Sequence, residues 1–270
     1  AVLLCGRVPG RVPGRLQAQW KRFSSAAPSP APAPGTPAFV KLSLARVRAQ
    51  IDEALSEAPH SCPPRLLAVS KFHDASLVEA AYHEGQRHFG ENYVQELVAK
   101  SQACPADIEW HFIGNLQSNK AKQLVEGCPG LSVVESVHST KVADKLNAAV
   151  LAAGRRPLRV FIQVNTSGED SKSGVTPGEE VSLAKHLQSR CQGLRLAGLM
   201  TIGMLDYTCR PENMQTLKEC RARVAEAAGL AEEELELSMG MSEDFRAAVL
   251  MGSTEVRVGR TLFGPRPVKP

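Results

Sequence analysis

Short apolar runs and amphipathic stretches alternate between Leu66 and Val258, and this alternation restricts the fold more than any other feature of the sequence. The apolar runs are four to seven residues long and rich in Val, Leu and Ile, which is typical of buried strands. Strands that alternate with helices predict a parallel sheet. The eight predicted strands are Leu66–Ser70, His88–Glu91, Glu109–Ile113, Leu131–Glu135, Leu158–Val164, Leu194–Met200, Glu236–Met239 and Glu255–Val258.

Helices are predicted between these strands from apolar residues spaced three or four positions apart. A further helix is predicted ahead of the first strand, at Val40–Ala58, and Leu262 and Phe263 are expected to pack the closing end. The seven intervening helices are Ala75–Glu84, Tyr93–Ser101, Ser118–Glu126, Ser139–Ala153, Gly178–Ser189, Glu212–Ala228 and Ser242–Met251.

Eight such units in roughly 200–250 residues predict an α/β protein with a single (β/α)8 TIM barrel. An open, doubly wound sheet is the alternative. Such a sheet usually has a G-x-G-x-x-G turn after its first strand, whereas the first strand here ends in Ser70 and Lys71. The barrel is therefore the predicted fold, spanning residues 37–270.

Residues 1–36 differ in composition from the rest of the chain. They hold five of the 32 basic residues, no Asp or Glu, and a run of Ser, Ala and Pro, which is the composition of an organelle transit peptide. A disordered Pro-rich tail that carries no targeting signal is the alternative. We predict an intracellular protein that is mitochondrial or plastid if residues 1–36 are a transit peptide and cytoplasmic otherwise.

The rest of the chain excludes several classes of partner and site. It carries 27 basic and 28 acidic residues, so no basic face for nucleic acid is indicated. No apolar run approaches the roughly 18 residues that a membrane span requires. The seven cysteines contain no C-x-x-C pair and no histidine at zinc spacing, so we expect reduced thiols and no metal.

Lys71 is the first candidate for chemistry, because it directly follows the buried run of the first strand. An ammonium group next to an apolar strand is costly unless it is paired or its pKa falls, and a lowered pKa lets an amine attack an aldehyde. The alternative is a lysine that merely begins a solvated loop.

In a barrel, side chains at the carboxyl ends of the strands face one pocket, because the βα loops all open on the same face. This geometry gives Lys71 a pocket instead of a random loop position. The residues expected around it are Lys71, Asn92, Asn115, Ser136, Asn165, Thr201, Met239 and Arg257.

The last two units predict an anion site in that pocket. Loops after the seventh and eighth strands of barrels commonly bind phosphate through backbone N–H groups. Ser242 is expected near a helix start with a free hydroxyl, and Gly259 allows the backbone to approach an anion closely. A simple N-cap and a simple turn glycine are the alternatives. A lysine that can form an imine, opposite a phosphate site, suggests pyridoxal 5'-phosphate (PLP) as the cofactor.

Seven segments together resemble the pyridoxal phosphate homeostasis proteins, the YggS or PROSC family. The resemblance runs from about residue 40 to the end of the chain. It implies a barrel like the N-terminal domain of alanine racemase. The segments are AVSK (68–71), FGENYVQE (89–96), WHFIGNLQSNK (110–120), VNTSGEDSKSG (164–174), GLMTIG (198–203), LSMGMSEDF (237–245) and VRVGRTLFG (256–264).

The resemblance also implies roles for individual residues. Lys71 would hold the aldehyde carbon of PLP as an imine, and Arg257 would face the pyridine nitrogen. Ser242, Gly259 and the backbone of Arg260 would bind the phosphate, and Asn92 completes the predicted cofactor-binding set. Because a guanidinium does not give up its proton, the pyridine nitrogen would stay unprotonated, which weakens the ring as an electron sink.

We therefore expect a monomeric PLP carrier that takes part in PLP homeostasis, delivers the cofactor to apo-enzymes and has no catalytic residue. A PLP-dependent amino-acid racemase, with Lys71 as one base, is the alternative.

Two departures from the family pattern affect the expected pocket. Phe72, His73 and Asp74 stand where many members have Thr or Lys and then Pro, and Arg260 replaces a frequent Ser or Thr. His73 and His111 are expected to be structural or surface residues, and Tyr82 and Tyr93 are expected to pack between helices.

Overall fold

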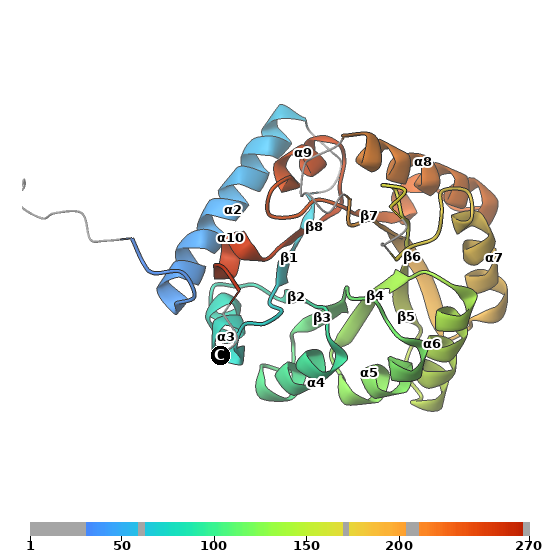
Figure 1. Cartoon of the computed structure of the whole chain (residues 1–270), viewed down its shortest axis with the longest axis horizontal. Helices are drawn as coiled ribbons and strands as arrows, with labels where there is room; N and C mark the ends of the chain where they lie inside the picture. Colours follow the sequence, from blue (N-terminus) through green and yellow to red (C-terminus); the bar gives the residue numbers. More distant parts are fainter. Residues whose placement is uncertain (1–30, 59–62, 170–172, 204–210, 267–270) are drawn as a thin grey trace, which may run out of the picture. The chain divides into compact units, whose positions relative to one another are not determined.

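The eight predicted strands form a closed barrel in the order of the sequence, with every neighbouring pair parallel, including β1 with β8 (Figure 1). This computed structural model describes residues 31–58, 63–169, 173–203 and 211–266, so nearly all of the predicted leader lies outside the described residues. The barrel belongs to a compact unit that starts at Ala33. The strands are β1 (Arg65–Val69), β2 (His88–Glu91), β3 (Glu109–Phe112), β4 (Leu131–Val137), β5 (Leu158–Gln163), β6 (Leu194–Met200), β7 (Glu236–Ser238) and β8 (Glu255–Val258).

The helices surround the barrel, and each covers the outer face of the strands beside it (Figure 1). Helix α2 begins at Pro37 behind the N-cap Thr36, whose hydroxyl accepts the N–H of Phe39 at 3.3 Å. It packs against α3, α9 and α10 and so completes the ring of helices next to β1. The α-helices are α2 (Pro37–Glu57), α3 (Ala75–His83), α4 (Val94–Ala103), α5 (Ala121–Gly127), α6 (Thr140–Ala152), α7 (Glu180–Arg190), α8 (Pro211–Ala228), α9 (Phe245–Leu250) and α10 (Arg260–Phe263).

The predicted single (β/α)8 barrel is confirmed, but several helix boundaries differ from the prediction. Ser118–Lys120 form a 3-10 turn, and α5 begins after it, at Ala121. Helix α9 begins at Phe245 and not at Ser242, because the Asp244 carboxylate accepts the N–H of Met241 and folds residues 241–244 into a turn. Ser242 therefore lies in a loop. The segment after β8 forms the short helix α10, which buries Leu262 and Phe263 completely.

The layer between the strands and the helices differs in composition from the space that the strands enclose. Between strands and helices lies the large apolar core, whose largest buried side chains include Trp110, Phe89 and Phe112. Inside the barrel the apolar clusters are small, and register pairs place charged residues there, such as Arg65 beside Glu255. Because a buried charge must be paired, the barrel interior is where polar networks are expected.

Two further observations concern the classes excluded above. Among the described helices, none combines the length and hydropathy that crossing a bilayer requires. The four described cysteines are buried free thiols at Cys104, Cys128, Cys191 and Cys220, while the other three lie outside the described residues.

Candidate functional site

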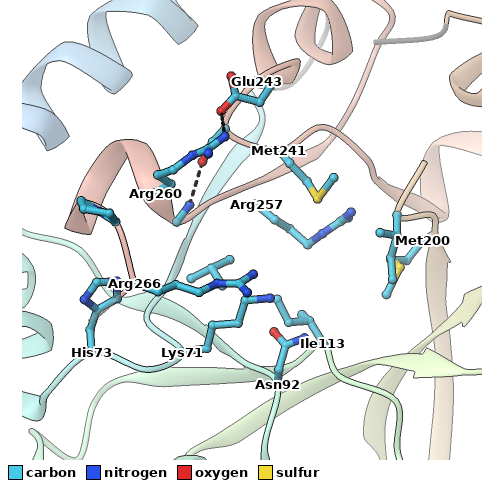
Figure 2. A pocket seen from close by; sticks show the side chains of 16 residues that line it. Lys71, His73, Asn92, Ile113, Met200, Met241, Glu243, Arg257, Arg260 and Arg266 are labelled. Carbon is cyan, nitrogen blue, oxygen red and sulfur yellow. Dashed lines mark hydrogen bonds and ion pairs between the residues drawn. The ribbon is translucent and has the colours of Figure 1, made fainter. Parts of the chain in front are cut away.

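A cavity of about 500 Å³ opens at the carboxyl ends of the strands (Figure 2). All six predicted site residues line it: Lys71, Asn92, Ser242, Arg257, Gly259 and Arg260. They come from the ends of β1, β2, β7 and β8, so the chain brings them together through the closure of the barrel between β8 and β1.

Lys71 enters the pocket from the loop after β1 and forms no hydrogen bond or ion pair with the described residues. Burial lowers the pKa of its amine most, and the positive charge of Arg266 lowers it further. Glu91 opposes these effects more strongly than Arg257 adds to them, and Glu96 opposes them least. A larger fraction of Lys71 is therefore an uncharged amine near neutral pH than for an ordinary lysine. Such an amine can attack a carbonyl carbon.

The loop that follows Lys71 has an unusual backbone. Phe72 adopts φ = 68°, the left-handed region that a bulky residue rarely enters. Its N–H donates to the Glu96 carboxylate at 2.9 Å, and its ring lies 5.2 Å from that of Tyr93. These contacts hold the turn in which the sequence departs from the family pattern.

A buried polar network supports the strand end that carries Lys71. The Lys100 ammonium donates to the Ser70 carbonyl at 2.8 Å and to Glu91 Oε1 at 2.6 Å, and the Ser70 hydroxyl donates to the same Glu91 oxygen at 2.7 Å. Sequence reasoning missed Lys100 and Glu91. The available signal was a lysine on the face of α4 that also carries the buried residues Val94 and Leu97.

Arg257 is held at the floor of the pocket by two strands. Its guanidinium donates to the Ser238 hydroxyl at 2.7 Å and to the Thr201 carbonyl at 2.6 Å. The side chain is almost fully buried and projects between Met241 and Met200 in Figure 2. A permanently charged donor is thus fixed opposite Lys71.

Ser242 and the chain after β8 bring a hydroxyl and several backbone N–H groups together. The Ser242 Oγ lies 3.3 Å from the N–H nitrogen of Gly259 and 3.5 Å from that of Thr261. Arg260 is the first residue of α10, so its N–H has no acceptor within the helix. A side chain at position 259 would place its Cβ 3.1 Å from the Val69 carbonyl oxygen, so glycine permits this close approach.

The Arg260 side chain points away from this backbone. Its guanidinium forms an ion pair with the Glu243 carboxylate at the exposed rim of the pocket (Figure 2). The role of the Arg260 backbone in binding phosphate stays a prediction.

Several lining residues were not predicted. Arg266 reaches the pocket from the segment after α10, and its guanidinium lies over the Phe72 ring at 5.3 Å. No described residue pairs with it. The Asn92 Oδ1 atom is buried without a hydrogen-bond partner among the described residues, so a ligand donor would satisfy it. Apolar walls come from Val69, Ile113, Met200, Ile202 and Met241.

The expectation that every strand end would face one space was wrong for five residues. Asn115 is exposed, and the Asn165 amide donates within its own loop to the Glu169 carbonyl at 2.9 Å. Thr201 and Met239 line a smaller neighbouring cavity, and Ser136 is buried outside the pocket lining. The reason is that successive residues of a strand face opposite sides, so a shift of one position removes a side chain from the pocket.

The predicted histidines and tyrosines occupy different places. His73 lines the pocket, with its ring 5.4 Å from that of Phe263, and burial lowers its pKa. His111 lies inside the barrel and is fully buried. Tyr82 is partly buried and packs against the apolar core, while its hydroxyl donates to Asp107 at 2.7 Å at the surface; Tyr93 is half exposed, with its ring 5.2 Å from that of Phe72.

Comparison with known proteins identifies the family. Residues 42–267 match the model described as alanine racemase, N-terminal domain. The pyridoxal phosphate homeostasis protein of Mus musculus is 43% identical over 240 residues, which cover 84% of this chain and 87% of that protein. Its namesake in Caenorhabditis elegans is 44% identical over 238 residues, which cover 85% and 97%.

Solved structures agree with this assignment. PipY of Synechococcus elongatus PCC7942, solved with PLP bound, is 34% identical with a TM-score of 0.67 and covers 83% of this chain and 100% of its own. Alanine racemase of Corynebacterium glutamicum, at 16% identity and a TM-score of 0.61, shares the fold over 85% of this chain and 62% of its own. The chain belongs to the alanine racemase N-terminal domain family and, within it, to the pyridoxal phosphate homeostasis proteins.

Proposed function

We propose that this protein binds PLP covalently through Lys71 and serves as a carrier that keeps the cofactor available to apo-enzymes. The observation that carries the proposal is the joint placement of an unpaired amine of lowered pKa and an anion-binding backbone in one cavity. PLP bound in the relative PipY and the name of the curated relatives support the choice of cofactor.

The residues present fit this cofactor in four respects. Lys71 supplies the amine for the aldehyde carbon. The Ser242 hydroxyl, which accepts the N–H of Gly259 and keeps its own hydrogen to donate, and the N–H of Arg260 supply donors for the phosphate. The Oδ1 of Asn92 is open to a donor, and Arg257 offers a guanidinium to the ring nitrogen. When bound, PLP supplies an electrophilic aldehyde and an electron-withdrawing ring.

The proposal that the protein is a carrier without catalysis rests on the hydrogen bond that Arg257 would donate to the pyridine nitrogen. A guanidinium keeps its protons at any accessible pH, so it donates to the ring nitrogen and leaves it unprotonated. That arrangement weakens the ring as an electron sink and disfavours carbanion chemistry. Met200, Met241 and Ile113 form an apolar wall of the same pocket.

A transfer assay tests the carrier role directly. The loaded protein is mixed with a PLP-dependent apo-enzyme, and recovery of that enzyme's activity is compared with recovery in an equal concentration of free PLP plus a PLP scavenger. Activation that persists with the scavenger supports delivery by contact. Activation that the scavenger abolishes contradicts it.

Proton exchange at the α-carbon of D- and L-alanine in heavy water tests the alternative, a racemase. The carrier proposal expects exchange no faster than with free PLP. Exchange by the wild type that disappears in Lys71→Ala would overturn it.

The finer statements on assembly and location are also proposals. We expect a monomer inside the cell, in mitochondria or plastids if residues 1–36 act as a transit peptide. Light scattering of the full chain tests the first statement. A fusion of residues 1–36 to a fluorescent protein tests the second.

A further inference from the structure

Four buried side chains inside the barrel connect to Arg257 but lie outside the pocket lining: His111, Glu135, Ser238 and Glu255. They come from β3, β4, β7 and β8. Both carboxyl groups are fully buried, and both reach the same hydroxyl: Ser238 Oγ lies 2.6 Å from Glu135 Oε2 and 3.1 Å from Glu255 Oε1.

The donors and acceptors around Ser238 Oγ indicate which carboxyl group carries a proton. Its Oγ accepts an N–H from Arg257 at 2.7 Å and has a single hydrogen to donate. That hydrogen goes to the nearer oxygen, on Glu135. The third contact, with Glu255 Oε1, then needs a hydrogen on Glu255, because two bare oxygen acceptors at this distance would repel each other.

His111 defines which carboxyl group is ionised. Its Nδ1 lies 2.8 Å from Glu135 Oε1 and 3.4 Å from Glu255 Oε2, so Glu135 is the nearer acceptor, while its Nε2 has no partner among the described residues. Burial lowers the pKa of His111, so the ring is neutral and carries its proton on Nδ1. Glu135 thus accepts two hydrogen bonds as a carboxylate, from His111 and from Ser238.

Charged groups from the other strands surround the pair. Arg65 on β1 donates to Glu255 Oε2 at 3.0 Å and to Glu236 at 2.6 Å, and Arg159 on β5 pairs with Glu236. The half-buried His88 on β2 has its ring 5.6 Å from that of His111. Burial raises the pKa of both carboxyl groups, and Arg257 opposes the rise at Glu135. Burial and the neighbouring Glu135 raise the pKa of Glu255 to about 7, which agrees with a proton on Glu255.

We propose that Glu135 and Glu255 hold one proton between them and, through Ser238, position the Arg257 guanidinium at the floor of the cofactor pocket. The pair consists of positioning residues, because neither carboxyl group lines the pocket. The expected effect on PLP binding rests on the proposed function. The shared proton and the hydrogen-bonded link from the pair to Arg257 are independent of that function.

Loss of that proton has a definite consequence. Ser238 then faces two carboxylates with one hydrogen, and a second negative charge lies beneath Arg257. The guanidinium is drawn toward the barrel interior, away from the cofactor. Binding of PLP is therefore expected to weaken as the pH rises through about 7.

The first experiment uses the cofactor-free full chain. Carbon-detected NMR of the glutamate carboxyl groups is expected to show one buried carboxyl that titrates near pH 7 in the wild type and not in Glu255→Gln. The Arg257 side-chain nitrogen signals should shift with the same midpoint. Two carboxyl groups that are both ionised at pH 6 would overturn the shared proton, and Arg257 signals that do not move with the titration would overturn the positioning role.

The second experiment compares PLP affinity across pH. The amide introduced by Glu255→Gln keeps a hydrogen toward Ser238 at every pH, so this variant should match the wild type at pH 6 and bind about fivefold tighter at pH 8.5. Ser238→Ala should weaken binding at least about tenfold at pH 6, because Arg257 loses its acceptor. The matched control is Glu126→Gln, whose side chain is half exposed and remote from the barrel interior.

The outcomes separate the two proposals. The positioning role is overturned if the ratio of PLP affinities between Glu255→Gln and the wild type is the same at pH 6 and at pH 8.5. Absence of PLP binding in every variant overturns the proposed function, and the NMR experiment still decides the shared proton and its link to Arg257.

Discussion

The Nζ of Lys100 lies 2.6 Å from Oε1 of Glu91 beneath the strand end that presents Lys71 to the pocket. Both side chains are buried, and Lys100 also holds the Ser70 carbonyl. The conformation of the Lys71 loop therefore depends on an ion pair between Lys100 on α4 and Glu91 on β2.

Substitution of Lys100 by Met leaves the Glu91 carboxylate buried and unpaired. Removal of one partner of a buried pair typically costs about 3–5 kcal/mol, so the free energy of unfolding should fall by that amount in urea denaturation at pH 7. The control is Lys122→Met, because Lys122 is 76% exposed and should change stability by no more than about 0.5 kcal/mol. Equal effects of the two substitutions would contradict the structural role of Lys100.

Arg266→Gln is expected to raise the pKa of Lys71, because Arg266 is the largest of the positive charges that lower it. The wild-type amine is less protonated at a given pH, so the variant should react more slowly with an amine-directed reagent near neutral pH. The rate of modification of Lys71, followed by mass spectrometry across pH, measures the shift. Arg260→Gln is the control, since its guanidinium is paired with Glu243; a larger shift there than in Arg266→Gln would refute the assignment.

Glu255 predicts a pH dependence of stability. Its pKa in the folded protein is about 7 against an ordinary 4.5, so the folded state binds a proton that the unfolded state has lost between these values. Stability from this group is complete below pH 4.5 and is lost as the pH rises to about 7, by about 3 kcal/mol. The difference in unfolding free energy between wild type and Glu255→Gln should change by that amount over the window, and a constant difference would speak against the raised pKa.

Ser242→Ala should distinguish phosphate binding from ring binding. Loss of a hydroxyl that bonds a charged group costs about 1.5–3 kcal/mol, which is a factor of roughly 10–100 in PLP affinity. Pyridoxal, which lacks the phosphate, should bind wild type and variant equally. A matched loss for both ligands would place the phosphate elsewhere in the pocket.

The barrel could be predicted because each strand and helix leaves a separate periodic signal, and eight repetitions leave few folds to choose from. The placement of Lys71 and Arg257 followed from the same count of strands, because they lie at the ends of the first and the eighth. Lys100, Glu91 and Arg266 could not be predicted this way, because their roles depend on contacts between elements that no local pattern records. The start of α9 was misplaced because the Asp244 side chain competes with the helix for the N–H of Met241.

The chemical identity of the pocket's lysine is the central claim. The full chain is incubated with PLP, reduced with borohydride, digested and mapped by mass spectrometry, with Lys71→Ala and Lys122→Ala treated in parallel. We expect a reduced phosphopyridoxyl group on Lys71 in the wild type and in Lys122→Ala, together with an absorbance band that Lys71→Ala lacks. A modified lysine other than Lys71 as the main product, or an unchanged band in Lys71→Ala, would contradict it.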